Sequence, residues 1–313
     1  MRFCISGYGS IAGVHRDALI QIPGVEFDSV VGRLIDPARE FAEDSGASFA
    51  TVDMGEALQR PGLDAVLIAS PSSAHFGQAK QALGAGKDVL VEIPMALSFA
   101  EAEELCKLAD ENKKLLMICH TQRFYASSIE VKRRITDGVL TPRHFHVEFE
   151  YLRRENTNWQ GRMRSWTDNI LWHHGGHVID LAIWLFREEP ESVNAYFGPD
   201  DNPLGMPLDM SAQMSFPGGG LATYAMSYNA MVPRESERMT LICDEDLLRW
   251  HDLRVTDHLD RLVKDEPFAE AVLRQDREFV EAVRARREPL ASGREILRSW
   301  RHMDRLEASA RPT

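Results

Sequence analysis

The sequence predicts an α/β protein in which a doubly wound parallel sheet is followed by an α+β domain with a mostly antiparallel, open sheet. Short apolar strands alternate with amphipathic helices over residues 1–120, a glycine-rich turn directly follows the first strand, and the pattern changes after residue 120. The 313 residues are enough for two domains, which we expect at 1–120 and 121–313.

The first 120 residues contain runs of Val, Ile and Leu that are typical of strands buried on both faces of a parallel sheet. Strands are expected at Arg2–Ser6, Val25–Val31, Ala65–Ala69, Asp88–Val91 and Leu115–Cys119. Helices are expected at Ile11–Ile20, Pro37–Asp44, Ala74–Leu83 and Phe99–Glu111. This alternation indicates a doubly wound sheet.

Residues 121–313 contain alternating segments separated by tight turns. Strands are expected at His144–Tyr151, Ser192–Phe197, Asp209–Phe216, Leu221–Tyr228 and Arg238–Cys243. Helices are expected at Ser127–Thr136, Gly176–Phe186, Glu270–Arg286 and Arg294–Ala310. The pattern predicts an α+β domain built on a mostly antiparallel sheet. We expect this domain to bind the substrate and to mediate oligomerisation, and its last helix is one that can pack back on the first domain.

The composition of the chain argues against several classes of binding partner. The formal net charge of -12 argues against nucleic acid, which requires a basic surface. No apolar run approaches the roughly 20 residues of a membrane helix, and Met1 leads directly into a strand, so we expect a cytoplasmic protein that does not bind membranes. The four cysteines are scattered, without metal-ligand or redox spacing.

The first strand runs into Gly7-Tyr8-Gly9-Ser10-Ile11-Ala12, which fits the G-x-G-x-x-G/A pattern. The strand before it and the helix after it are the context that this pattern requires in a Rossmann domain. Gly7 permits the tight turn, Gly9 lets the backbone approach a pyrophosphate, and Ala12 allows close helix–strand packing. We therefore expect a nicotinamide dinucleotide at the helix N-terminus.

The residues after the second strand indicate which of the two dinucleotides, NAD or NADP, the domain binds. NAD-specific domains place an acid there for the ribose 2′-hydroxyl, but Asp28 comes too early and Asp36 too late. Gly32 and Arg33 occupy the position instead, and a guanidinium suits a 2′-phosphate. This predicts NADP rather than NAD; the alternative for Arg33 is a solvated loop arginine.

Four segments together resemble the superfamily of glucose–fructose oxidoreductase and inositol dehydrogenase: the glycine turn, the loop Ala69–His75, Val91-Glu92-Ile93-Pro94, and His177-Val178-Ile179-Asp180. The resemblance implies cofactor contacts from the loops after the fourth and fifth strands and a catalytic role for His177. The residues concerned in the two loops are Ser70, Pro71, Ser72, His75, Glu92 and Ile93.

Two positions depart from the superfamily pattern. Ile93 replaces a lysine, and His173 replaces an aspartate four residues before the histidine. The stretch Arg164–His174, together with His120–Phe124 and Gln275–Phe279, looks like a subgroup, the dehydrogenases of 4-carboxy-2-hydroxymuconate-6-semialdehyde. The likeness to this subgroup of bacterial aromatic degradation implies NADP-dependent oxidation of a cyclic hemiacetal to a lactone.

His173 and His177 are four residues apart and share one helix face if the helix already runs at 173. Three alternatives are a metal site, hydrogen-bonded core or cap histidines, and a proton-transfer pair. We favour the last, because oxidising a hemiacetal removes a hydroxyl proton and a histidine titrates near neutral pH. His177 is the expected general base and His173 its partner; no metal is expected.

A basic segment suggests an anionic substrate. Residues 121–164 carry nine Lys or Arg against five Asp or Glu, a local balance of +4 (9 − 5). Arginines hold carboxylates by paired hydrogen bonds, although any one of these could equally be a solvated arginine. Trp159, Trp166 and Trp172 are suited to enclosing a flat ring or to core packing. The expected substrate ligands are Arg123, Arg154, Arg164, Trp166 and His120, with Arg153 as a further candidate.

The function expected is an NADP-dependent dehydrogenase of a small carboxylated hemiacetal or alcohol. The alternatives are a sugar or cyclitol dehydrogenase of the same superfamily and a dinucleotide-sensing regulator without turnover. Because an open antiparallel sheet face is usually covered by another subunit, we also expect a homodimer or homotetramer.

Overall fold

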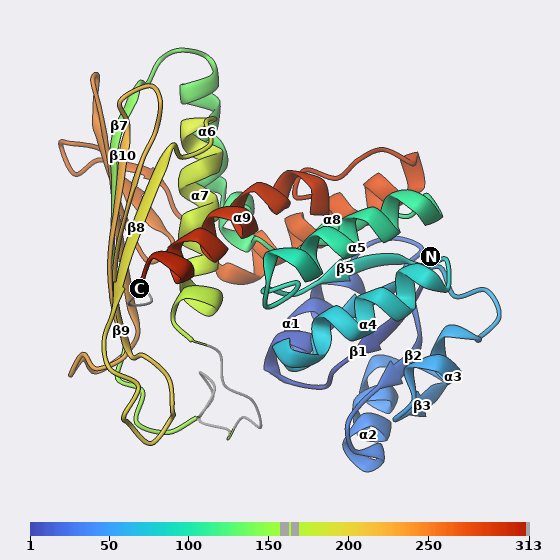
Figure 1. Cartoon of the computed structure of the whole chain (residues 1–313). Helices are drawn as coiled ribbons and strands as arrows, with labels where there is room; N and C mark the ends of the chain where they lie inside the picture. Colours follow the sequence, from blue (N-terminus) through green and yellow to red (C-terminus); the bar gives the residue numbers. More distant parts are fainter. Residues whose placement is uncertain (157–162, 164–168, 311–313) are drawn as a thin grey trace. The chain divides into compact units, whose positions relative to one another are not determined.

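The computed structural model describes residues 1–156, 163 and 169–310 (Figure 1). The chain divides into two compact units, the first formed by residues 1–120 with 272–297 and the second by residues 121–271 with 298–313. The first unit is therefore discontinuous in sequence. A segment near the C-terminus completes its interior.

The first unit is built on a parallel sheet of six strands in the order β3-β2-β1-β4-β5-β6. Its strands are β1 (Arg2–Ser6), β2 (Glu26–Val31), β3 (Phe49–Thr51), β4 (Ala65–Ile68), β5 (Asp88–Val91) and β6 (Leu116–Ile118). This confirms the predicted doubly wound sheet and its five apolar strands. The sequence analysis did not find β3, which is three residues long.

Helices connect the parallel strands of this sheet, as crossover connections require. They are α1 (Ser10–Leu19), α2 (Ile35–Ser45), the short α3 (Met54–Leu58), α4 (Ser72–Gly84) and α5 (Phe99–Asn112). Most of helix α8 (Phe268–Ala285) also belongs to this unit. Its Phe279 ring lies 6.0 Å from that of Phe3 on β1. Both rings are fully buried, so α8 belongs to the unit's core.

The second unit contains a sheet of eight strands in the order β14-β13-β12-β11-β7-β10-β9-β8. Every neighbouring pair is antiparallel except β7 with β10, so the sheet is mixed and mostly antiparallel, as predicted. The strands are β7 (Pro142–Glu150), β8 (Ser192–Phe197), β9 (Asp209–Ser215), β10 (Leu221–Ser227), β11 (Ser236–Cys243), β12 (Leu247–His251), β13 (Arg254–Thr256) and β14 (Leu262–Lys264).

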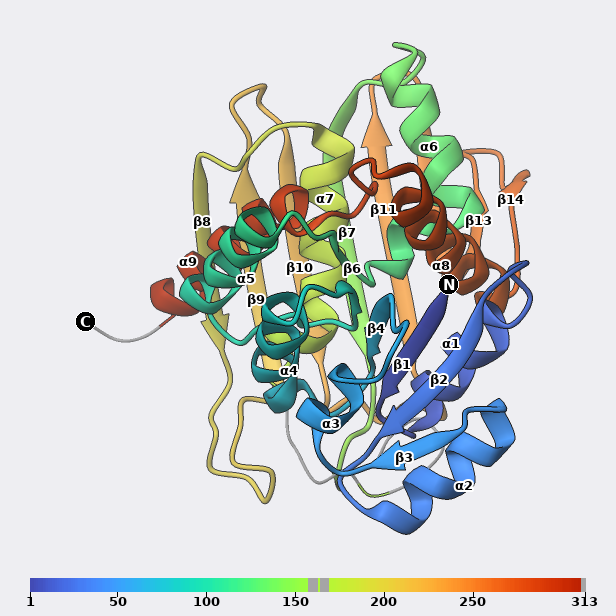
Figure 2. The same cartoon turned by 90° about the vertical axis from the view of Figure 1, so that its right-hand side faces the viewer.

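The two faces of this sheet differ because side chains alternate along each strand. On β7, Phe145, Val147 and Phe149 are buried, whereas the residues between them are partly exposed. Helices α6 (Ala126–Thr136) and α7 (Gly176–Phe186) lie on the same, buried face (Figures 1 and 2). No helix within the described part of this unit covers the opposite face. The remaining helix, α9 (Gly293–Ser309), closes the chain.

Gly7 is a position that only glycine fits. Its φ is +112°, and an added Cβ would lie 2.3 Å from the carbonyl oxygen of Ala69, the residue after β4. Gly13, on α1, offers a matched comparison, because a Cβ there meets nothing within 4 Å.

We expect Gly7→Ala to lower the free energy of unfolding by roughly 2–4 kcal/mol, through left-handed backbone and overpacking. Gly13→Ala should be neutral or stabilising by up to about 1 kcal/mol, because alanine favours helix. Urea unfolding of both variants measures this; equal effects would contradict the stated constraint at Gly7.

Candidate functional site

The carboxyl ends of the parallel strands form one edge on which the predicted cofactor residues of the first unit lie. Backbone hydrogen bonds run along this edge, from Gly7 N to Val31 O (2.8 Å), Ala69 N to Ser6 O (2.8 Å) and Glu92 N to Ile68 O (2.9 Å). The glycine turn and the loops after β4 and β5 are thus neighbours. Such an edge is where doubly wound sheets bind ligands.

The turn between β1 and α1 fits the pyrophosphate of a dinucleotide. Gly9 is the N-cap of α1 and no side chain caps it, and a Cβ built on Gly9 meets nothing within 4 Å. Open space therefore lies over a helix N-terminus, which attracts anions. Ala12 is fully buried, as close helix–strand packing requires. Ser10 and Ile11 form the first turn of α1.

The Tyr8 ring packs over the backbone at Gly32, where a Cβ would lie 2.4 Å from Tyr8 Cε1. Arg33 is exposed, and within the described residues its guanidinium has no ion-pair or hydrogen-bond partner. Asp28 is buried and bound to Arg2 and Arg60, so it cannot serve a ribose. These contacts leave Arg33 available at the end of β2; its contact with a 2′-phosphate stays a prediction.

His75 holds the two other predicted cofactor loops together. Its Nδ1 lies 2.8 Å from the carbonyl oxygen of Pro94 and its Nε2 2.8 Å from that of Ser70. The Ser70 hydroxyl donates to Gln78 (2.7 Å). Pro71 and Ser72 begin α4. His75 is nearly fully buried, so it shapes the edge through the loop backbones.

Glu92 directly follows β5 and makes contacts that the sequence analysis did not anticipate. Its Oε1 lies 2.7 Å from Nε2 of His15 on α1, and its Oε2 accepts the N–H of Ile93 (3.1 Å). The Nδ1 of His15 lies 2.8 Å from Asp276 on α8. Ile93, which replaces the superfamily lysine, is buried as an apolar residue.

One group of described residues has the composition of a metal site: His15, Glu92 and Cys119, whose ligand atoms lie within 4.8 Å of one another. Two ligands of a tetrahedral zinc ion stand about 3.4 Å apart. The His15–Glu92 separation of 2.7 Å is that of a direct hydrogen bond. The geometry therefore supports hydrogen bonding rather than ion coordination.

In the second unit, the predicted catalytic histidines lie where a π-helical turn, Leu171–Gly175, passes into α7. Such turns are rare and often occur at functional sites. His173 belongs to the π turn and donates its backbone N–H to Asn169 O (3.1 Å), and His177 lies in the first turn of α7. Both side chains are partly exposed. Their proton-transfer role stays a prediction.

His174 has contacts of its own, and its ring also lies edge-on to that of His173, with the centroids 4.4 Å apart. Its ring stacks on Phe149 at 4.1 Å, and its Nδ1 lies 2.6 Å from the hydroxyl of Tyr228. Trp172 is buried 6.4 Å from the ring of Trp300, so for this tryptophan the structure shows core packing.

Arg123, a predicted substrate ligand, has an internal ionic partner. Its Nε and Nη2 donate to the two oxygens of Asp180 at 2.6 and 2.7 Å, and Ser299 Oγ donates to the same carboxylate (2.6 Å). Arg123 and Asp180 are 4% and 0% exposed. A paired guanidinium at this depth anchors α7 to the 3₁₀ turn Thr121–Phe124. The substrate role predicted for Arg123 stays a prediction.

The structure describes three of the other candidate substrate ligands. Arg154 is exposed and donates to Asn229 (2.9 Å), whereas Arg153 is buried and donates to Asn156 (2.6 Å). His120 is fully buried. Arg164, Trp166 and Trp159 lie outside the described residues.

The sequence analysis missed Glu237 on β11, whose two oxygens accept the side-chain N–H groups of Gln122 at 2.8 and 3.0 Å. Burial raises the pKa of Glu237 to about 7, with smaller contributions from Glu235 and Asp252. Gln122 lies within the stretch that resembled the subgroup, but a strand glutamate 115 residues away gives no local signal.

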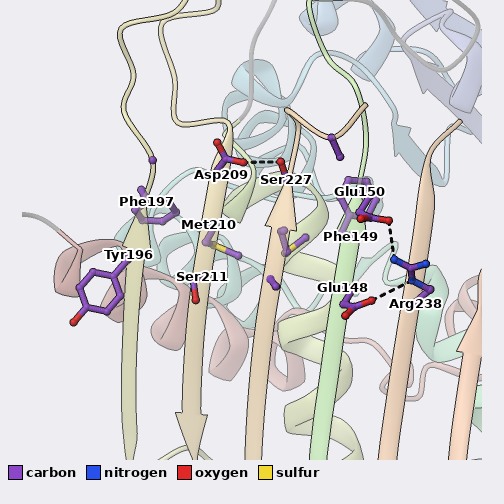
Figure 3. A pocket seen from close by; sticks show the side chains of 14 residues that line it. Glu148, Phe149, Glu150, Tyr196, Phe197, Asp209, Met210, Ser211, Ser227 and Arg238 are labelled. Atoms are coloured by element: carbon purple, nitrogen blue, oxygen red, sulfur yellow. Dashed lines mark hydrogen bonds and ion pairs between the residues drawn. The ribbon is translucent and has the colours of Figure 1, made fainter. Parts of the chain in front are cut away.

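A pocket of about 500 Å³ lies on the second unit (Figure 3). Its lining comes mostly from the last residues of β7, β8 and β10 and the first residues of β9 and β11. Arg238 spans Glu148 and Glu150 there, and Tyr196 stands at the opposite side. None of the predicted catalytic or cofactor residues lines it, so we do not place the chemistry in this pocket.

The fold and the edge described above define a dinucleotide-binding oxidoreductase. Residues 1–120 match the model of the oxidoreductase family with an NAD-binding Rossmann fold, and residues 126–261 that of the bacterial oxidoreductase C-terminal domain. The chain belongs to this GFO/IDH/MocA family, and it is an NAD(P)-binding dehydrogenase.

Known proteins are similar to this chain over most or nearly all of its length. A 4-carboxy-2-hydroxymuconate-6-semialdehyde dehydrogenase from Sphingobium is 36% identical over 98% of both chains. A scyllo-inositol 2-dehydrogenase (NAD(+)) from Bacillus subtilis is 27% identical over 65% of this chain and 59% of its own. The structure of a levoglucosan dehydrogenase with NADH and levoglucosan has a TM-score of 0.86 at 16% identity, covering 99% and 97% of the two chains, which shows the shared fold.

Within the described residues, no helix is long and apolar enough to cross a membrane.

We expect Arg123→Ala to lower the free energy of unfolding by about 3–5 kcal/mol, because it leaves the Asp180 carboxylate buried without its cation. Arg133→Ala, on the exposed side of α6, should leave the melting temperature almost unchanged. Calorimetry of both variants measures this. A raised substrate KM with normal stability in Arg123→Ala would contradict this structural role and support the predicted substrate contact.

Proposed function

We propose that this chain is an NADP-dependent dehydrogenase that oxidises a small carboxylated hemiacetal or alcohol, with the hemiacetal of 4-carboxy-2-hydroxymuconate semialdehyde as its preferred substrate and a lactone as product. The observation that carries the proposal is the full-length identity of 36% to a dehydrogenase of that semialdehyde. The uncommitted Arg33 supports NADP, and the two partly exposed histidines support proton transfer from a hydroxyl.

The residues of the first unit would hold the dinucleotide, with the turn Gly7–Ala12 at the pyrophosphate and Arg33 at the 2′-phosphate. When bound, the dinucleotide supplies a hydride acceptor. His177 takes the proton of the hemiacetal hydroxyl, and His173 orients its imidazole. With isoleucine at position 93, no ammonium from that position takes part, so the proton path depends on histidine.

Removing the hydroxyl proton needs a group that is unprotonated at the working pH, which for a histidine is the neutral imidazole. We therefore expect His177→Ala to lower kcat by about 10²–10⁴-fold and to leave the cofactor dissociation constant unchanged. The measurement is NADPH formation from the semialdehyde, with His251→Ala, an exposed histidine on β12, as control. Wild-type protein that forms no NADPH with this substrate or with related carboxylated hemiacetals would refute the proposed activity.

The cofactor preference rests on one guanidinium. Arg33→Ala should raise the KM for NADP about ten- to a hundredfold, the cost of losing charge-assisted hydrogen bonds, and change the KM for NAD little. Arg39→Ala, an exposed arginine on α2 bound to Asp36, is the control. A wild-type enzyme that prefers NAD would contradict the NADP proposal.

We propose a homodimer or homotetramer that covers the outward face of the eight-stranded sheet. Tyr196 and Leu221 on that face are 70% and 47% exposed, and no helix of the described second unit shields them. A monomeric mass by light scattering would contradict this.

A sugar or cyclitol dehydrogenase remains the second candidate, because the Bacillus subtilis relative acts on scyllo-inositol. The buried Ile93 in place of the lysine weighs against it. A dinucleotide-sensing regulator without turnover would bind NADP and exchange no hydride with any substrate, which the same assays distinguish.

A further inference from the structure

A histidine enclosed between two carboxylates lies beneath the cofactor edge of the first unit. His15 is fully buried, its Nδ1 lies 2.8 Å from Asp276 Oδ2, and its Nε2 lies 2.7 Å from Glu92 Oε1. An ionised carboxylate only accepts hydrogen bonds, so both ring nitrogens must donate. With both carboxylates ionised, the ring is therefore an imidazolium.

The charges around the ring agree with this state. Burial is the largest single influence on His15 and disfavours its charged form, but Asp276 and Cys119 together outweigh it and raise the pKa of His15 well above its usual range. Burial also raises the pKa of the Asp276 carboxyl, and the charge of His15 opposes that rise. The other titratable groups that face the ring are Glu92, which follows β5, and Cys119, which follows β6. Burial raises the pKa of the Cys119 thiol, which keeps it neutral.

The cluster connects three segments that are far apart in the sequence. His15 lies on α1, which begins at the phosphate turn; Glu92 begins the loop after β5; and Asp276 lies on α8, 261 residues from His15. The second oxygen of Glu92 accepts the N–H of Ile93, so the carboxylate also fixes the loop backbone. The Glu92 side chain is 14% exposed and reaches the surface at the cofactor edge.

We infer that His15 and Asp276 are positioning residues for the dinucleotide site: Asp276 orients His15, and His15 holds the Glu92 carboxylate and the loop after β5 in their binding arrangement. This inference rests on the proposed function for the role of that loop at the cofactor. Apolar residues would fill the same interior at less desolvation cost, so packing alone does not account for three ionisable groups here.

The decisive variant is Asp276→Asn, which keeps the side-chain shape and removes the charge. Without that charge, burial dominates and the pKa of His15 falls, so His15 loses a proton as pH rises and one ring nitrogen stops donating. We expect the dissociation constant for NADPH to match the wild type near pH 6 and to be roughly tenfold higher near pH 9.

The quantity to compare is the ratio of variant to wild-type dissociation constants from NADPH fluorescence titrations, because titration of the cofactor's phosphate cancels in it. Glu278→Gln, on the same helix and paired with the partly exposed Arg287, is the matched control and should give a ratio near one at every pH. A ratio for Asp276→Asn that does not change with pH would overturn the inference, even with lowered stability.

A second measurement does not depend on how the variant folds. In wild-type protein with ¹⁵N-labelled histidine, both ring nitrogens of His15 should stay protonated through about pH 9, with the signal assigned by its absence in His15→Gln. A neutral His15 ring at pH 7 would overturn the inference. Neither measurement needs the substrate, so a failure of the proposed activity would be a separate result.

Discussion

The close approach of Gly7 to the Ala69 carbonyl is the constraint on which the binding edge of the first unit depends. The strand order reverses between β1 and β4, and this is the place where doubly wound sheets bind ligands. Because Gly7 has no side chain, the turn after β1 lies directly against the end of β4 and directs α1 over the edge. His75 and Glu92 then fix the loops that flank this turn.

The second unit depends on a different kind of contact. Arg123, Asp180 and Ser299 form a buried ionic network that joins a 3₁₀ turn, α7 and α9. This network anchors the helix that begins immediately after the π turn, and it therefore supports the segment that carries His173 and His177. An arginine that looked like a substrate ligand in sequence is part of this support.

Most of the fold could be predicted because its elements have local signals. The strands of the parallel sheet are continuous apolar runs, and the longer helices have clear ends. The short elements β3, α3 and β12–β14 were not found, since three to five residues carry too little periodicity. The parallel pairing of β7 with β10 was not predictable either, because a strand's own pattern does not specify its partner's direction.

The residues of the site were predictable only where their role depends on their neighbours in the sequence. The phosphate turn and Arg33 could be identified from neighbouring residues, whereas the partners of His15, Arg123 and Gln122 lie 57 to 261 residues away. Burial decides what such groups do, and it is a property of the folded chain. The sequence alone shows one basic segment, residues 121–164. In the folded chain, some of its arginines are buried and others are exposed.

The discontinuity of the first unit has a consequence for how the protein is made. During synthesis, residues 1–120 emerge long before residues 272–297, so the early chain contains His15 without Asp276 and β1 without Phe279. Domains usually fold from the N-terminus as they appear. Here the N-terminal sheet must wait until residues 121–271 have been translated before the His15–Asp276 ion pair and the core helix α8 can form.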